Sequence, residues 1–199
     1  MTTVLERLRT ETRSSHEQTE ALLYSDALRG GTLSPHAYGH LLRTHAAYHQ
    51  ALERAIDEHA DFFAGYEPES RRKTPWLQAD LAALDLTSLD STSVFEGWSP
   101  VALLGAAYVG EGSMLGGKTV WHYLQQSPAL LPLLQNARFY RGYGADTGER
   151  WRTFGAFITR QADGQADQVV DAARRAFAAY HSLFRQTLPL AGSRELPQD

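Results

Sequence analysis

Residues 99–126 of this 199-residue chain read SPVALLGAAYVGEGSMLGGKTVWHYLQQ, and the architecture can be worked out from this segment. Its first two residues, Ser99 and Pro100, are types that α-helices favour at the cap and at the first helical position. The sequence therefore predicts one long helix that ends near Gln126. Four glycines fall within eight positions near its middle, at Gly110, Gly112, Gly116 and Gly117.

These glycines carry an energetic cost that suggests a use. Each glycine inside a helix costs about 1 kcal/mol relative to alanine, so four cost about 4 kcal/mol. Gly112 and Gly116 are one turn apart and open the same face, where a flat group could reach the backbone. Tyr108 lies one turn earlier on that face, and its hydroxyl could meet a carboxylate. A close helix–helix crossing remains the alternative, although a crossing usually needs only two small residues.

The rest of the chain also has helical periodicity and lacks the alternating pattern of strands. A segment at 65–73 is charged and contains Pro68, which predicts a surface loop, and the glycines between 142 and 148 predict another. We expect a single all-α domain over residues 1–190, with its helices packed on one core, and a flexible tail at 191–199. Helices are predicted at 3–29, 34–60, 75–83, 128–132, 151–162 and 165–188.

Composition excludes several classes of function. The formal net charge of −4 provides no basic surface for a nucleic acid. The chain has no cysteine, which rules out disulfides, thiolate metal sites, thiol catalysis and covalent haem attachment through a Cys-x-x-Cys-His motif. The charged N-terminal segment has no secretory pattern, and no window is apolar enough for a membrane span. We therefore expect a cytoplasmic protein that binds neither nucleic acid nor membrane.

His16 is the most informative residue of the first predicted helix. At 100° per residue it lies about 20° from Leu5 and Leu23, which places it on the core-facing stripe. Arg9 is on nearly the same line, about 10 Å away along the axis, a plausible distance from an iron to the rim of a porphyrin. Glu20, one turn further on, could accept a hydrogen bond from the ring. A lone histidine is more often a satisfied core residue, and that alternative stays open.

Two segments resemble the haem-binding helices of haem (heme) oxygenases. LRTETRSSHEQTEALL, residues 8–23, is similar to the helix that carries the axial histidine, and YVGEGSMLGG, residues 108–117, is similar to the glycine-rich helix of bacterial members. Arg-Phe-Tyr at 138–140 and Phe177, which would wall the pocket, follow in the family's order. The resemblance covers roughly residues 4–188 and implies a helical bundle with haem between a proximal and a distal helix.

The resemblance gives the proximal side and the haem edge their candidate residues. His16 corresponds to the ligand of the haem iron, and Glu20 to the neighbour of its other ring nitrogen. Arg9 and Tyr108 correspond to partners of the haem propionates. Arg152 corresponds to a second basic propionate partner, through a looser match beside the glycine loop.

On the distal side the resemblance implies bare backbone. Gly112 and Gly116 match the glycines that pack on the ring, and Gly117 supports the same bend. Many members place an aspartate directly after the first distal glycine, where it organises water around bound oxygen. This chain has Ser113 there and Glu111 just before the glycine, so the candidate catalytic set is Gly112, Ser113, Gly116 and Glu111. Two alternatives follow, a differently anchored water network or weaker activity.

The resemblance implies oxidative cleavage of haem to biliverdin, carbon monoxide and ferrous iron, with haem as both substrate and cofactor. Oxygen and external electrons would be needed, and the chain has no nucleotide or flavin fingerprint of its own. A ferredoxin- or flavoprotein-type reductase is therefore the expected electron donor. A biliverdin acceptor such as a phytochrome is a further candidate partner.

Other functions are compatible with parts of the sequence. A di-iron carboxylate bundle needs Glu-x-x-His pairs, which the chain lacks. The pairs His36/His40 and His45/His49 have the spacing for a surface metal, although most such pairs are simply solvated. A non-catalytic haem carrier or sensor on the same fold would share His16 and the glycine helix. A helical enzyme of the thiaminase or PQQ-synthesis type would need no haem.

Overall fold

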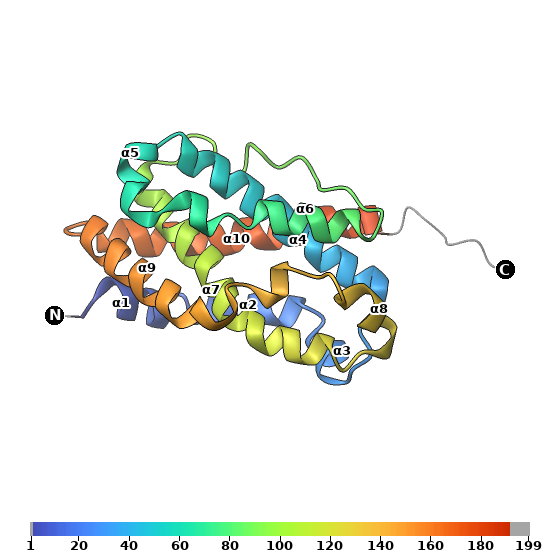
Figure 1. Cartoon of the computed structure of the whole chain (residues 1–199). Coiled ribbons are helices and arrows are strands. Elements are labelled where there is room, and N and C mark those ends of the chain that lie inside the picture. The colour runs from blue at the N-terminus through green and yellow to red at the C-terminus, as the bar shows by residue number, and fades with distance from the viewer. Residues whose placement is uncertain (1, 192–199) are drawn as a thin grey trace.

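Three long helices form the centre of the computed structural model, which describes residues 2–191, with side chains described to residue 188. They are α4 (Pro35–Asp57), α7 (Pro100–Leu124) and α10 (Ala166–Ala191). α10 packs against both α4 and α7, while α9 (Thr147–Gln161) packs on α7 (Figure 1). All regular structure in the described residues is helical, which confirms the predicted all-α class.

Shorter elements connect and cover these helices. No helix within residues 2–191 is long and apolar enough to cross a membrane. The predicted tail lies outside the described residues except for Ala191. The shorter elements are α1 (Val4–Glu11), α2 (Arg13–Leu22), α3 (Ser25–Arg29), α5 (Ala60–Phe63), η1 (Ala64–Tyr66), η2 (Pro68–Arg71), α6 (Thr74–Ala82), η3 (Pro128–Leu130), α8 (Leu131–Leu134), η4 (Phe139–Arg141) and η5 (Gly144–Asp146).

Serine caps determine where two of the long helices begin. Ser34 Oγ accepts a hydrogen bond from the backbone N–H of Ala37 at 3.1 Å, and Ser99 Oγ accepts one from that of Ala102 at 3.2 Å. Both caps confirm the predicted starts. α9 begins at Thr147 rather than at residue 151, because the η5 turn leads directly into it.

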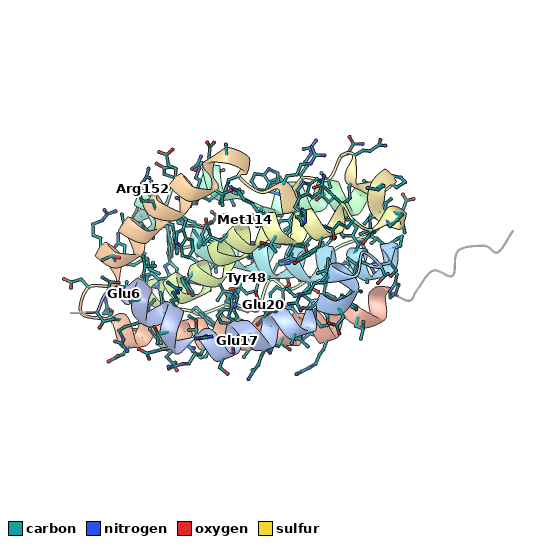
Figure 2. The ribbon with its side chains drawn as sticks, turned by 90° about the horizontal axis from the view of Figure 1, so that it is seen from below. Glu6, Glu17, Glu20, Tyr48, Met114 and Arg152 are labelled. Carbon is teal, nitrogen blue, oxygen red and sulfur yellow. The ribbon has the colours of Figure 1, made fainter. Side chains whose placement is uncertain are left out.

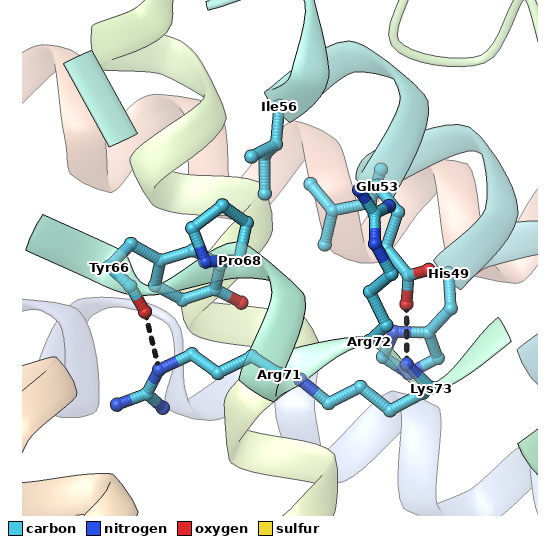
Figure 3. A pocket seen from close by; sticks show the side chains of 9 residues that line it. His49, Glu53, Ile56, Tyr66, Pro68, Arg71, Arg72 and Lys73 are labelled. Atoms are coloured by element: carbon cyan, nitrogen blue, oxygen red, sulfur yellow. Dashed lines mark hydrogen bonds between the residues drawn. The ribbon is translucent and has the colours of Figure 1, made fainter. Parts of the chain in front are cut away.

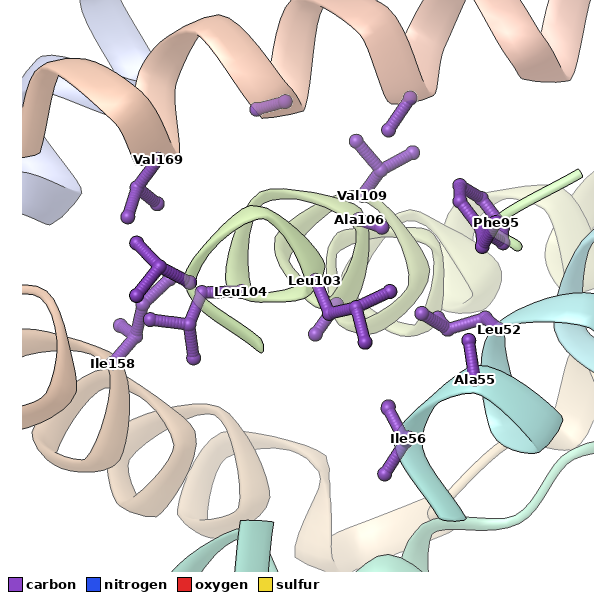
Figure 4. Close-up of a cluster of buried hydrophobic side chains, with 14 of the residues drawn as sticks. Leu52, Ala55, Ile56, Phe95, Leu103, Leu104, Ala106, Val109, Ile158 and Val169 are labelled. Carbon is purple, nitrogen blue, oxygen red and sulfur yellow. The ribbon is translucent and has the colours of Figure 1, made fainter. Parts of the chain in front are cut away.

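The main hydrophobic core surrounds α7. Leu103 and Leu104 of α7 are fully buried, and side chains of α4, α9 and α10 pack around them (Figure 4). Gly105, between these elements, allows α7 and α10 to approach closely. A Cβ added there would lie 2.5 Å from the backbone nitrogen of Ala173 and 2.6 Å from the carbonyl oxygen of Val169. This is the small-residue helix crossing, and it lies outside the glycine cluster that suggested one.

Gly105→Ala should therefore destabilise the protein. The added methyl group meets backbone, which cannot rotate away as a side chain can, so we expect a loss of about 1–3 kcal/mol in the free energy of unfolding. Urea denaturation followed by circular dichroism measures it. Gly148→Ala is the matched control, because a Cβ there meets no atom within 4 Å. Equal losses in both variants would contradict the crossing.

The prediction of one helix over residues 3–29 is wrong, because the segment breaks into α1, α2 and α3. The first break is at Thr12, with φ −105° and ψ 6°, and the second is at Tyr24, which is left-handed at φ 55°. Helical angles cannot be added across such breaks, so the predicted core-facing position of His16 is also wrong. None of the ten residues of α2 is buried, and 58% of the His16 side chain is exposed.

The prediction of a surface loop at 65–73 is wrong as well. The segment forms η1 and η2, and three of its polar side chains are buried: Tyr66, Arg71 and Lys73. A buried cation needs a counter-charge, and Glu111 of α7 provides it. Arg71 and Lys73 of this segment therefore make an internal contact, while Glu67 and Glu69 are exposed.

The histidine pairs of α4 do not form a surface metal site, because His40, His45 and His49 are buried. Burial lowers the pKa of His45 to about 3 and holds that of His49 well below its usual value. Both rings are therefore neutral at pH 7. Among the described residues, no group of three or more His, Cys, Asp or Glu side chains is placed to hold a metal ion.

Candidate functional site

The middle of α7 exposes its backbone on one face. A Cβ added at Gly112 or Gly116 would meet nothing within 4 Å beyond α7 itself. Gly110 and Gly117 point in other directions. A Cβ added at Gly110 would lie 3.1 Å from the side chain of Leu52 on α4, and one added at Gly117 would lie 3.6 Å from the carbonyl oxygen of Tyr140. Two of the four glycines therefore admit neighbouring elements, and two keep a face free of side chains. Gly117 fits against η4.

The segment from α1 to α3 runs along α7, and both ends of this segment contact α7. Near one end the Tyr108 hydroxyl lies close to the Thr12 side chain. Near the other, a Cβ added at Gly31 would lie 2.7 Å from the carbonyl oxygen of Gln126. α2 lies between these contacts and beside α7, as Figure 2 shows from below. It therefore faces the part of α7 that carries the two open glycines.

His16 lies on α2 with its ring accessible. Its Nδ1 is 3.8 Å from Oε2 of Glu20, and the ring stands edge-on to Phe177 of α10, with 6.2 Å between centroids. A carboxylate beside one ring nitrogen orients an imidazole and makes the other nitrogen a better metal ligand. Because no cluster of metal-binding side chains surrounds His16 in the described structure, a metal held there must bring its other ligands with it.

Tyr108 lies within reach of the positive charge of Arg9. Burial raises the pKa of Tyr108, while the nearby Thr12 hydroxyl and the positive charge of Arg9 act in the opposite direction. The Tyr108 ring also lies 5.9 Å from that of Trp151 on α9. Arg152 follows Trp151 and is largely exposed, with its guanidinium 3.9 Å from Glu149 (Figure 2). Arg9 and Tyr108 thus lie near the α1 end of the open face, whereas Arg152 lies on the solvent side of α9.

Ser113 and Glu111 have different surroundings although they flank Gly112. Ser113 Oγ donates to the carbonyl oxygen of Gly110 at 2.7 Å, within its own helix. Glu111 is only 2% exposed and is turned into the protein, where it pairs with Arg71 at 3.0 Å and with Lys73. The structure therefore does not bring Glu111 to the open face.

Four residues that sequence reasoning missed surround the Glu111 carboxylate. Arg71 and Lys73 supply charge, and the hydroxyls of Tyr66 and Tyr143 donate to it at 2.9 and 3.1 Å. Burial lowers the pKa of Lys73, and the negative charge of Glu111 opposes that shift. The network joins α7 to η2 and to the segment before η5. No spacing rule reveals it, because the segment 66–73, Glu111 and Tyr143 are far apart in the sequence.

A small cavity lies beside this network (Figure 3). Its volume is about 10 Å³, and His49, Glu53 and Lys73 are among the residues that line it. Neither ring nitrogen of His49 has a hydrogen-bond partner among the described residues. A space of this size takes one water molecule and no organic substrate. The candidate site is therefore the open face of α7 rather than this cavity.

Comparisons with known proteins agree with this geometry. The family model described as Heme oxygenase matches residues 2–95 and 92–186. A protein of Xanthomonas campestris pv. campestris (strain 8004) named Heme oxygenase is 28% identical over 159 residues, which cover 78% of this chain and 93% of that protein.

Two solved structures have a similar fold. The NO- and CO-bound heme oxygenase from Neisseria meningitidis gives a TM-score of 0.75 at 21% identity, over 100% of this chain and 98% of that chain. Heme oxygenase from Leptospira interrogans gives a TM-score of 0.77 at 16% identity, over 94% and 100%. At these identities the two structures bear on the fold alone.

Proposed function

Because the chain belongs to the haem oxygenase family, we propose that it cleaves haem oxidatively to biliverdin, carbon monoxide and ferrous iron. The main support is an accessible imidazole, His16, on a helix that faces bare backbone at Gly112 and Gly116. This donor set suits haem, whose iron is already held by the ring nitrogens and needs only axial ligands from a protein.

On the proximal side, His16 would hold the iron through Nε2. Glu20 would accept a hydrogen bond from Nδ1, which fixes the tautomer, and Phe177 supports the ring from α10. Haem, when bound, supplies the iron that activates oxygen and the ring that is cleaved. The task of these residues is to place one neutral imidazole at a fixed orientation.

On the distal side, the chain contributes shape rather than an acid or a base. Gly112 and Gly116 offer backbone against which a flat ring can lie. The Ser113 hydroxyl donates within its own helix, so it presents lone pairs to its surroundings. This favours the alternative of a differently anchored water network. Glu111 faces the interior, and we propose that it holds α7 in place.

At the α1 end, Arg9 and Tyr108 would bind a haem propionate, and Arg152 would bind the second. Arginine and tyrosine donate charge-assisted hydrogen bonds to carboxylates. Such contacts fix the in-plane rotation of the ring, and that rotation selects the carbon that is attacked. For Arg152 this requires its side chain to move, because the guanidinium is exposed and lies 3.9 Å from Glu149 on the surface.

Electrons for the proposed reaction would come from another protein. We propose a ferredoxin- or flavoprotein-type reductase as the donor, a cytoplasmic location that gives access to it, and a biliverdin acceptor such as a phytochrome as a later partner. The support is chemical: cleavage consumes electrons, and the sequence has no nucleotide or flavin motif to supply them.

A haem titration followed by turnover tests the proposal. We expect a Soret band that saturates at one haem per chain, replaced by biliverdin absorption when reductant and oxygen are added. Haem binding without turnover would indicate a haem carrier or sensor rather than an oxygenase. Failure to bind haem would overturn both and favour a thiaminase-like enzyme.

Gly116→Phe should prevent haem from binding in the normal geometry. The ring would fill the space that a Cβ at this position enters without contact. Gly116→Ala is the matched control for folding, and it should raise the free energy of unfolding by about 0.5–1 kcal/mol. Optical titration and thermal melting measure both effects. An unchanged haem spectrum in the phenylalanine variant would mean that the open face is not the binding site.

A further inference from the structure

The helix that carries His16 is held to the body of the protein by few contacts. None of the ten residues of α2 is buried, and α10 is the long helix that packs against it. Two side chains of α10, one turn apart, reach α2: Phe177 meets the His16 ring, and His181 Nε2 lies 2.7 Å from Thr19 Oγ1. The first contact is apolar and permits sliding, whereas the second is directional.

The direction of each hydrogen bond around Thr19 can be assigned. Thr19 Oγ1 donates its single proton to the carbonyl oxygen of Ser15 at 2.8 Å. It can then only accept from His181, so Nε2 of His181 carries a hydrogen. Two hydrogen bonds in series therefore connect α10, through Thr19, to the backbone of Ser15. Ser15 immediately precedes His16.

We propose that His181 is a positioning residue for His16, acting through Thr19. Thr19 is three residues after His16 and therefore about 60° away around the helix axis. With Thr19 fixed against α10, the His16 ring keeps one edge on Phe177 of α10 and leaves its exposed part to the glycine face of α7. Without this bond, α2 keeps its packing against α10, including the edge contact with Phe177, but loses the directional contact that limits its rotation. The inference rests on the proposed function, because it assumes that His16 binds haem.

Thr19→Val tests the inference, since valine keeps the shape of threonine and removes its hydroxyl. We expect the dissociation constant for haem to rise about three- to tenfold, the effect of losing one hydrogen bond. We also expect the iron–histidine stretching band of the ferrous complex to shift or broaden in resonance Raman spectra. Thr19→Ser should restore both values. The double variant Thr19→Val/His181→Ala should be no weaker than either single variant, because both remove the same bond.

Thr159→Val is the matched control. Thr159 makes the same bond to the carbonyl four residues earlier, at 2.8 Å from Gly155, on α9 rather than on the helix that carries His16. The Thr159→Val variant should bind haem as the parent does. If Thr19→Val keeps the parent's affinity and Raman band, or if serine does not restore them, His181 does not position His16. If the parent itself binds no haem, the proposed function fails, and this inference fails with it.

Discussion

His16→Ala should abolish haem turnover while leaving the protein folded. Loss of a residue that only orients a metal ligand costs 10–100-fold in affinity or activity, so loss of the ligand itself should cost more than about 100-fold. Folding should be spared, because the side chain is 58% exposed and its neighbours are the Glu20 carboxylate and the Phe177 ring. Biliverdin formation, the Soret spectrum and far-ultraviolet circular dichroism together measure the outcome.

Two comparisons separate a lost ligand from a general defect. His36→Ala removes an exposed histidine at the start of α4, and it should bind and cleave haem as the parent does. Added imidazole should enter the space left in His16→Ala and partly restore the parent spectrum. Turnover at the parent rate in His16→Ala would show that the iron takes another ligand.

Local chemistry made part of the fold predictable. A serine followed by proline specifies a helix start through one side chain and its own backbone, so the starts of α4 and α7 follow directly from the sequence. The breaks in residues 3–29 depend on distant partners. Thr12 is buried close to Tyr108, and Tyr24 is held by His40 at 2.7 Å. A periodicity argument cannot include such contacts.

The candidate site, too, was predictable only where the signal is local in the sequence. The glycine pattern identified the open face, because a missing side chain is visible in a sequence. It also singled out Gly112 and Gly116, which share one face, but it could not show that Gly110 packs against α4 or that Gly117 lies beside η4, since that depends on which element lies opposite. Arg71 and Lys73 looked solvated for a similar reason: their partner, Glu111, is far away along the chain.

The Glu111 network should dominate the stability of this region. Glu111→Gln keeps the shape of the side chain and can still accept from Tyr66, but it removes the carboxylate that pairs with the buried Arg71 and Lys73. Breaking a buried ion pair in this way costs about 3–5 kcal/mol. Urea denaturation at pH 7 measures the loss. Glu149→Gln is the control: its partner Arg152 is 3.9 Å away with both side chains exposed, so it should lose little.

The loss in the free energy of unfolding caused by Glu111→Gln should become smaller as the pH rises. Burial already lowers the pKa of Lys73, and the charge of Glu111 opposes that effect, so the variant's Lys73 should lose its proton at a lower pH than the parent's. The unfolded chain keeps that proton until near pH 10.5. Over this interval the unfolded state binds more protons, and stability therefore increases with pH. A loss that stays constant from pH 7 to about 9.5 would mean that Lys73 is not a buried cation dependent on Glu111.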